Sequence, residues 1–294
     1  MSKRVKCRIL VGVDGSAHAR AALQTVIHGP WPDGARVRAL AARPAGGAGH
    51  RSILLAALDR SAEDAASRAR RALVQRWPDA EAIAVDKAPV RGLLDEAATF
   101  NADVIVVGWR GYGGARGLLM GSVSRGVVRG AKCAVLVTKR RPRSRIQNIL
   151  IAYDGSPNAK RAVQLVARLA SGRNGRVTLV QVMESTPPSS RAPAIAGIRT
   201  SIARELKRIH ARRVKTADQA LKRAAAVLNR NGWKTRIELR TGEPLRELTE
   251  TARKTRADLV VAGARGASGV RHLLLGSVAE GILNRSAVPV LLAR

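Results

Sequence analysis

The chain has 294 residues, enough for two ordinary domains that each bury a core of their own. Its formal net charge of +32 at pH 7 predicts attraction to anions such as nucleotides, nucleic acid or anionic surfaces. Only two cysteines are present, which excludes a disulfide framework, and the few aromatic rings argue against the stacking platforms of single-strand binders.

Apolar strands alternate with helix-like stretches through the first half of the chain. We expect strands at about 6–13, 36–42, 82–86, 103–107 and 133–137, and helices at about 17–28, 53–76, 89–100 and 122–129. The first strand closes on Asp14, Gly15 and Ser16, where the Asp and the Ser can cap the next helix.

The run from Lys139 to Arg145 is basic, contains a proline, and is interpreted as a linker between domains at 1–139 and 146–294. A nuclear-localisation or nucleic-acid patch is the alternative for this run. The second half repeats the order of the first, again with a strand that closes on Asp-Gly-Ser at Asp154. Its strands are expected at about 148–153, 176–183, 235–240, 258–262 and 288–292, with helices at 157–170 and 198–231, one from 244 and one from 277.

Two glycine-rich loops follow the fourth strands at one fixed offset. The positions shared by the two loops lie 155 residues apart: Gly108, Gly111, Gly121 and Ser122 in the first, and Gly263, Gly266, Gly276 and Ser277 in the second. A strand that ends in glycines lets the backbone approach a ligand, and a helix that starts at Gly-Ser offers unpaired N–H groups to an anion. The pattern therefore favours a phosphate cradle over a tight loop whose Ser only caps the helix.

The alternation of strands and helices predicts an α/β fold with a mainly parallel sheet and helices on either side. In such sheets a ligand binds at the carboxyl ends of the strands, near the switch in strand order. The Asp-Gly-Ser turn follows the first strand of each half, and the glycine loop follows the fourth. If these strands are neighbours, the turn and the loop line one crevice.

These residues resemble the universal stress protein family in its tandem form, over nearly the whole chain. The resemblance rests on the Asp-Gly-Ser turns, the G-x2-G-x9-G-S loops and the ending A-V-P-V-L-L at 287–292. It implies two repeated doubly wound domains, each a five-stranded parallel sheet of order 3-2-1-4-5 flanked by helices. It also implies that the two domains pair through their fifth strands within the chain. The strands opened by Cys7 and Cys133 are then not neighbours, and the thiols lie roughly 9 to 10 Å apart, too far for a disulfide.

The resemblance also implies a set of nucleotide contacts. Asp14 and Asp154 would meet the ribose or adenine side, the backbone of Ala42 and Val182 would meet the adenine edge, and the glycine loops would hold the phosphates. The implied set is Asp14, Ala42, Gly108, Gly111, Gly121, Ser122 and Val123 in the first half, and Asp154, Val182, Gly263, Gly266, Gly276, Ser277 and Val278 in the second. Four arginines stand at matching positions in the two loops, and each either contacts phosphate or is simply exposed to solvent. They are Arg110, Arg116, Arg265 and Arg271.

The first half departs from the family pattern in three places. Ala134 stands where the family usually has a proline, Lys87 stands where the second half has Gly242, and Ala42 is smaller than Val182 against an adenine ring. We therefore expect the second site to bind nucleotide more tightly than the first.

The implied ligand is ATP, or ADP or AMP, with Mg²⁺ or Mn²⁺ held mainly by phosphate oxygens and water. The sequence has no Walker-type lysine loop, no catalytic Ser-His-Asp set repeated in both halves, and five scattered histidines without metal-ligand spacing. We interpret the chain as an ATP-binding regulatory protein of the stress response with slow hydrolysis at most.

Two alternatives stay open, a dimerising scaffold without nucleotide affinity and a basic nucleic-acid-associated protein, although nucleic acid is not favoured. The sequence does not name the protein partner, and a homodimer is left open. No signal peptide and no membrane-spanning run is recognised, so a cytoplasmic location is expected.

Overall fold

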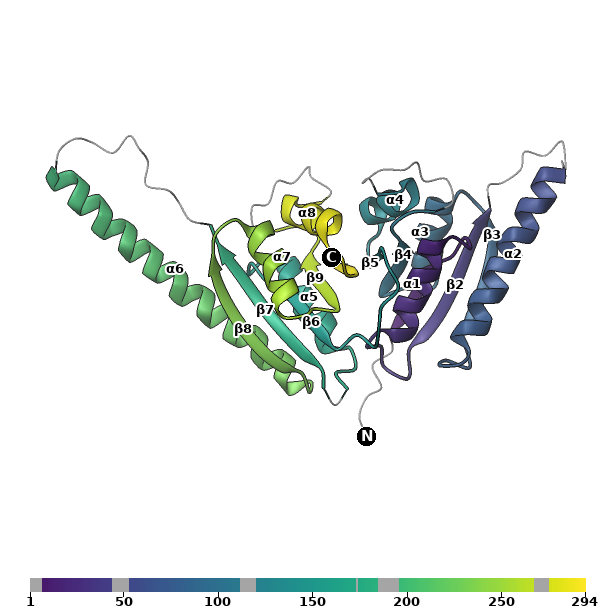
Figure 1. Ribbon diagram of the computed structural model, residues 1–294, viewed down its shortest axis with the longest axis horizontal. Helices are drawn as coiled ribbons and strands as arrows, with labels where there is room; N and C mark the ends of the chain where they lie inside the picture. The colour runs from purple at the N-terminus through teal and green to yellow at the C-terminus, as the bar shows by residue number, and fades with distance from the viewer. Residues whose placement is uncertain (1–6, 44–52, 112–119, 173, 185–195, 267–274) are drawn as a thin grey trace.

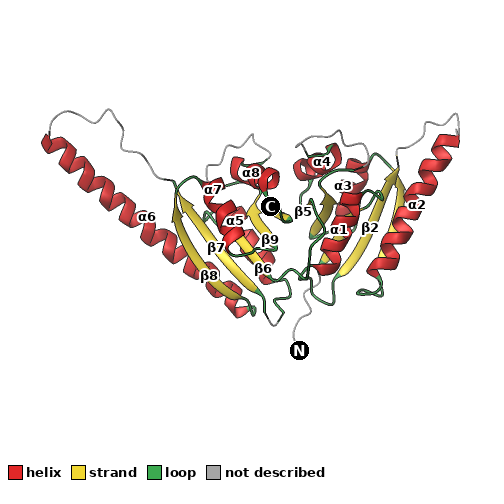
Figure 2. Cartoon of the chain, in the orientation of Figure 1, coloured by secondary structure: helices red, strands yellow, loops and turns green. Residues whose placement is uncertain are grey.

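The computed structural model describes residues 7–43, 53–111, 120–172, 174–184, 196–266 and 275–294. It shows an α/β protein in which helices cover both faces of one continuous sheet (Figures 1 and 2). Within the described ranges, no helix combines the length and the apolar character needed to cross a membrane.

The first half contains five strands and four helices in alternation. They are β1 (Arg8–Gly12), α1 (Ala17–His28), β2 (Arg36–Arg43), α2 (Ile53–Leu73), β3 (Glu81–Asp86), α3 (Pro89–Thr99), β4 (Val104–Gly108), α4 (Ser122–Gly130) and β5 (Ala134–Thr138). The strands pair in parallel in the order β3-β2-β1-β4-β5, which confirms the expected order.

The second half repeats this arrangement. Its elements are β6 (Asn148–Ala152), α5 (Pro157–Ala167), β7 (Arg176–Met183), α6 (Ala196–Arg230), β8 (Lys234–Thr241), α7 (Pro244–Lys254), β9 (Leu259–Gly263), α8 (Ser277–Arg285) and β10 (Val290–Ala293). The order is β8-β7-β6-β9-β10, again parallel. Helix α6 is longer than its counterpart α2 and extends past the sheet (Figure 1), which accounts for the extra residues of the second half.

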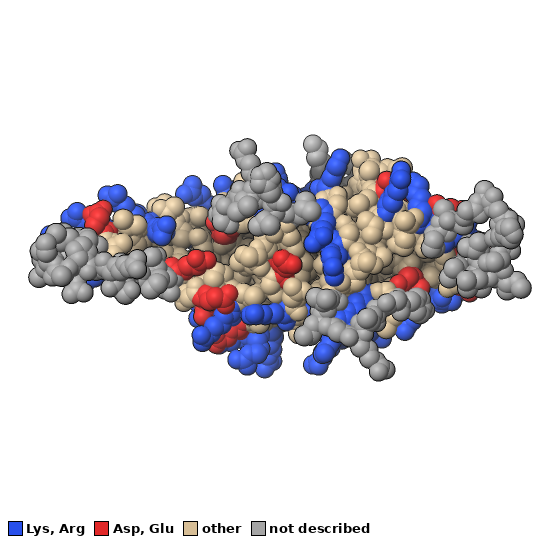
Figure 3. Space-filling view, turned by 90° about the horizontal axis from the view of Figure 1, so that it is seen from above, with Lys and Arg blue, Asp and Glu red and all other residues tan. Residues whose placement is uncertain are grey.

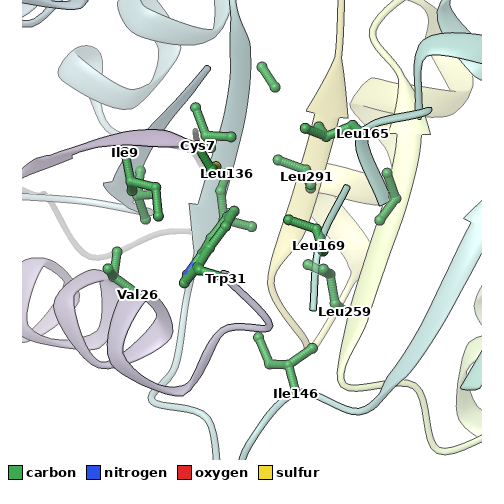
Figure 4. Close-up of a cluster of buried hydrophobic side chains, with 14 of the residues drawn as sticks. Cys7, Ile9, Val26, Trp31, Leu136, Ile146, Leu165, Leu169, Leu259 and Leu291 are labelled. Atoms are coloured by element: carbon green, nitrogen blue, oxygen red, sulfur yellow. The ribbon is translucent and has the colours of Figure 1, made fainter. Parts of the chain in front are cut away.

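The two halves join through their fifth strands, as the resemblance implies. Strand β5 pairs antiparallel with β10, and Leu136 stands opposite Leu291. Figure 4 shows these two side chains in one cluster with Trp31 of the first half and Leu165 and Leu169 of the second. A second cluster of buried side chains covers the other face of the sheet and likewise spans both halves. Strands that are apolar on both faces therefore build two cores that run across the junction.

Matching cations cross this junction in both directions. Lys139 follows β5, and its Nζ donates to the carbonyl oxygens of Asn284 and Ser286 at the end of α8, at 2.7 and 3.2 Å. Arg294 occupies the matching position after β10, and its guanidinium donates to the carbonyl of Val128 near the end of α4. A cation at a helix C-terminus offsets the negative end of the dipole. Each half thus stabilises the C-terminus of the helix whose N-terminus follows the other half's glycine loop.

Both cysteines are free thiols, at the starts of β1 and β5, which β4 separates. Burial, with a contribution from Asp103, raises the pKa of Cys7 to about 12, and burial also raises the pKa of the less buried Cys133. The thiolate is the reactive form, so at pH 8 nearly all of Cys7 is the unreactive thiol. We expect iodoacetamide to label Cys133 first in the folded protein and Cys7 only after denaturation. Equal labelling rates in the folded chain, measured by peptide mass spectrometry, would contradict this burial.

Candidate functional site

The turn after β6 uses Asp154 and Ser156 for different hydrogen bonds. Oδ1 of Asp154 accepts from the backbone N–H of Ser156 at 3.0 Å, and Oγ of Ser156 accepts from the N–H of Ala159 at 3.1 Å. Ser156 is therefore the N-cap of α5, whereas Asp154 orders the turn that precedes it. Gly155 has φ +78°, the left-handed region that favours glycine. The first half repeats these bonds at Asp14, Ser16 and Ala19, with Gly15 at φ +82°.

The glycine loops lie against these aspartates. A Cβ added to Gly266 would lie 2.9 Å from Oδ2 of Asp154, and one added to Gly111 would lie 2.6 Å from Oδ2 of Asp14. Both distances are shorter than real Cβ contacts, so a side chain at either position would have to displace the carboxylate. The expectation that turn and loop meet at one edge of the sheet is confirmed in both halves. Arg116 and Arg271, the distal loop arginines, lie outside the described residues.

Helix α8 begins without a side-chain cap. Its N-cap is Gly276, which makes no side-chain cap bond and whose own N–H donates to the carbonyl of Ala264 at 2.9 Å. Ser277 is the first helical residue and is exposed, so the alternative in which this serine only caps the helix is wrong. Gly121 and Ser122 occupy the same places at the start of α4. Among the described residues, the N-caps of both helices thus supply no side-chain acceptor to the first N–H groups, which suits an anion cradle.

Close packing against a neighbouring helix leaves no space for a side chain at Gly108 or Gly263. A Cβ on Gly108 would lie 2.5 Å from the carbonyl carbon of His18, and one on Gly263 would lie 2.8 Å from Cβ of Asn158. These glycines let the first turns of α1 and α5 approach the ends of β4 and β9. They therefore place the Asp-Gly-Ser turn beside the glycine loop, and a direct ligand contact for them stays a prediction.

The remaining predicted contacts lie at the same edge of the sheet. Val182 is half-buried near the end of β7, two residues past Val180, whose carbonyl accepts from the N–H of Tyr153 at 2.8 Å. Ala42 has the same position in β2, where Leu40 accepts from Val13 at 2.9 Å. Val123 and Val278 are half-buried second residues of α4 and α8.

A cavity of about 480 Å³ opens beside the start of α8 in the second half. It is lined by Glu184, Gly242, Glu243, Pro244, Leu245, Ser277 and Val278. Glu243 uses its carboxylate to cap α7 through the N–H groups of Leu245 and Arg246, at 3.1 and 2.7 Å, whereas Glu184 is exposed. Carboxylates at this wall repel anions, so the cavity suits an uncharged group.

Sequence reasoning missed Glu184 and Leu245 as cavity residues. The available signal for Glu184 was its place directly after a buried strand at the ligand-binding edge, next to the predicted contact Val182. No sequence pattern predicts Leu245 as a cavity residue, because a leucine in the first turn of a helix usually indicates a core position.

The first half has ion pairs where the second half has small or neutral residues. Lys87, at the position of Gly242, contacts Asp95 at 2.7 Å, and Arg43, at the position of Met183, pairs with Asp86. These partners lower the pKa of both aspartates. Ion pairs thus occupy this edge of the first half at positions where the second half has Gly242 and Met183, and the difference in affinity stays a prediction.

Partial burial, followed by the nearby charge of Arg110, lowers the pKa of His18 at the first site, whereas Asp14 acts in the opposite direction. The second half has Asn158 at this position, and its Nδ2 donates to the carbonyl of Arg265 at 3.4 Å.

Figure 3, which views the edge where the glycine loops lie, shows Lys and Arg in separate groups with Asp and Glu among them. The described residues hold no group of three or more His, Cys, Asp or Glu side chains placed to bind a metal ion.

Comparison with known proteins agrees with this geometry. The model of the universal stress protein family matches the chain twice, over residues 7–139 and 145–294. The chain belongs to the universal stress protein family. This universal stress protein is 30% identical over 222 residues to one from Mycobacterium tuberculosis, a match that covers 71% of this chain and 67% of that relative. It is 27% identical over 163 residues to the stress response protein NhaX of Bacillus subtilis, covering 50% of this chain and 96% of that relative.

A solved structure that covers nearly the whole chain has the same fold. The crystal structure of a universal stress protein from Archaeoglobus fulgidus superposes on this universal stress protein with a TM-score of 0.67 at 22% identity, covering 98% of each chain. Another universal stress protein from Archaeoglobus fulgidus, solved in complex with dAMP, covers 50% of this chain and 98% of its own, with a TM-score of 0.35 and 20% identity.

Proposed function

We propose that this universal stress protein binds an adenine nucleotide in its second half and acts as a regulatory protein of the stress response. One observation carries the proposal: Oδ2 of Asp154 faces a loop glycine at the edge where α8 begins without a side-chain cap. The two features supply a hydrogen-bond acceptor and a set of backbone donors at the same edge of the sheet, which supports a nucleotide site there.

The crevice suggests how the nucleotide lies. The adenosine part would occupy the cavity between the ends of β7 and β8 and the start of α8, with Asp154 toward the ribose hydroxyl groups and the backbone of Val182 toward the adenine edge. The phosphates would accept from N–H groups at Gly276 and Ser277, where the positive end of the helix dipole favours negative charge. With ATP, Mg²⁺ or Mn²⁺ would be held mainly by the phosphate oxygens and water.

The proposal assigns the tighter site to the second half. The first half has the Lys87–Asp95 and Arg43–Asp86 ion pairs at this edge, and Ala42 offers less apolar surface to an adenine ring than Val182. The proposal assigns no general base, so hydrolysis is slow at most and nucleotide occupancy is the signal passed to a protein partner.

Asp154→Asn tests the proposed role of this carboxylate. The asparagine keeps an oxygen for the N–H of Ser156, but it exchanges the charged acceptor beside Gly266 for a neutral amide. Losing one hydrogen bond to a charged group costs about 1.5 kcal/mol, so we expect the Kd of MgATP to rise about 10-fold. The measurement is a thermal-shift titration with ATP, ADP and AMP, with and without Mg²⁺.

Asp14→Asn is the matched control, because it makes the same change in the first half. It is expected to alter the high-affinity Kd by less than about twofold, compared with the change of about 10-fold expected for Asp154→Asn. If Asp14→Asn weakens binding and Asp154→Asn does not, the nucleotide belongs to the other half. If neither variant shifts the Kd, the carboxylates have no role in binding.

A further inference from the structure

A second cavity lies at the opposite edge of the sheet in the second half, where β6, β7 and β8 begin and α7 ends. It has a volume of about 650 Å³, within the range of small-molecule sites. Its walls carry four cationic side chains and no carboxylate, and we call it the basic cavity. The residues that line it are Asn148, Ile149, Arg176, Val177, Thr178, Lys234, Thr235, Arg236, Thr255 and Arg256.

Most of the positive charge in the basic cavity is not neutralised by the protein. Arg176, Lys234 and Arg256 are exposed and make no ion pair among the described residues. Nε of Arg236 lies 3.0 Å from Oε1 of Glu238, but that carboxylate also contacts Arg240 and so serves two arginines.

The nearby carboxylate of Asp258 is also engaged. Its Oδ2 accepts from the N–H groups of Gln147 and Asn148, at 3.0 and 2.9 Å. Backbone donors thus take up part of the acceptor capacity of this group. An excess of cations therefore faces the cavity.

The matching place in the first half is filled and neutralised. There Arg38 donates to both Glu81 and Glu96, and its guanidinium lies 4.4 Å from the centre of the Phe100 ring. Arg36, which matches Arg176, lies 3.6 Å from the same Glu81 carboxylate. One aromatic ring and two carboxylates thus occupy this corner of the first half.

The second half replaces these groups one by one. Thr178 stands at the position of Arg38, Arg236 at Glu81, Thr251 at Glu96 and Thr255 at Phe100. Lys234 further takes the position of Asp79. Together the substitutions remove the ring and the carboxylates and add Lys234 and Arg236, and although Thr178 removes the cation of Arg38, the net result is a more open and more positive cavity.

Arg256 occupies a backbone conformation that favours another residue. Its φ is +50°, and the matching residue of the first half, with the same φ, is Asn101. Asparagine is several-fold enriched at positive φ, whereas arginine there is uncommon. The second half thus carries a cation at a position where the backbone prefers asparagine, beside a cavity that three other cations line.

We propose that the basic cavity binds a small anion that carries two or more phosphate groups. Guanidinium groups match phosphate oxygens in geometry, and Lys234 adds a point charge. Three unpaired cations exceed the charge of one phosphate group, whereas a pyrophosphate unit neutralises them. This site is separate from the proposed nucleotide crevice, because the two lie at opposite edges of the sheet.

Calorimetric titration with pyrophosphate at fixed ionic strength tests the proposal. Each titration is made on the full chain carrying Gly276→Val, which removes the proposed phosphate cradle at α8 from the measurement. We expect pyrophosphate and tripolyphosphate to bind, and inorganic phosphate to bind at least about 10-fold more weakly, because it can meet fewer of the cations at once.

Arg256→Asn and Arg176→Gln should each weaken pyrophosphate binding about 10-fold, the loss of one charge-assisted hydrogen bond. Arg256→Asn installs the residue that the first half has at this φ, so the fold is expected to hold, and circular dichroism checks it. The matched control is Arg36→Gln, which should leave pyrophosphate binding unchanged.

No binding of pyrophosphate would overturn the proposal. Equal effects of Arg36→Gln and Arg176→Gln on pyrophosphate binding would also overturn it, because they would show diffuse attraction to the basic surface. Binding of random duplex DNA that is sensitive to Arg256→Asn, without binding of pyrophosphate, would assign the cavity to nucleic acid and would likewise overturn it.

Discussion

Gly276→Val is expected to raise the Kd of MgATP about 100-fold, because two charge-assisted hydrogen bonds of about 1.5 kcal/mol each are lost. A Cβ at this position would lie 3.4 Å from the backbone nitrogen of Gly266 and 3.7 Å from the carbonyl oxygen of Ala264. The Cβ itself therefore fits, but the two methyl groups of valine extend into the place where phosphate oxygens would accept from these N–H groups. The φ of Gly276 is −76°, which any residue adopts, so the chain is expected to fold.

The matched control for this prediction is Gly121→Val in the first half. The space is tighter there, since a Cβ would lie 3.1 Å from Cα of Arg110, so this variant is expected to disturb its own loop. It should nevertheless leave the high-affinity binding of MgATP unchanged. Isothermal titration of both variants, with melting curves to check folding, decides the result. Equal losses in the two variants would show that the loops act through the fold and not through a ligand.

Leu291→Ala is expected to lower the free energy of unfolding by about 3 kcal/mol, as large-to-small changes in tightly packed cores do. Leu291 is fully buried in β10, opposite Leu136 of β5, and both belong to the cluster that spans the two halves (Figure 4). Leu136→Ala should have a similar effect. Urea denaturation followed by circular dichroism measures both.

A double-mutant cycle then tests whether the halves share one core. Leu136 and Leu291 are cross-strand partners, so the double variant should deviate from additivity by at least about 0.5 kcal/mol. Leu179 in β7 is the control partner, because four strand spacings separate it from β5, roughly 19 Å. Leu136→Ala and Leu179→Ala should be additive. Additivity in both cycles would mean that β5 and β10 do not pair in solution.

The positions of the strands along the chain could be predicted because parallel strands that are buried on both faces are short apolar runs. Their order in the sheet was implied only by the family resemblance, and the structure confirms it. The sequence also predicted that α6 is long, because the Asp-Gly-Ser turns lie 140 residues apart and the glycine loops 155. The meeting of Asp154 with Gly266 followed from the rule that ligand sites gather at the carboxyl ends of neighbouring strands. These features depend on local patterns and on one rule of topology.

Features that depend on packing between distant segments could not be predicted. The open basic cavity appears only when Thr178 stands beside Arg236 in the sheet, and the sequence separates them by 58 positions. Lys139 was assigned to a basic linker, whereas the antiparallel pairing of β5 and β10 brings it to the end of α8. Likewise, the N-cap of α8 proved to be Gly276 and not Ser277, because the last loop residue, and not the serine, has extended dihedral angles.

Analysis of the nucleotide content of the purified protein tests the central claim most directly. The chain is denatured by heat, and the soluble fraction is separated by ion-exchange chromatography. If the second half holds a nucleotide at its glycine loop, the wild type should release an adenine nucleotide or bind MgATP with measurable heat, and Gly276→Val should release none and bind MgATP about 100-fold more weakly. No adenine nucleotide from the wild type, together with no heat on titration with MgATP, would contradict the account.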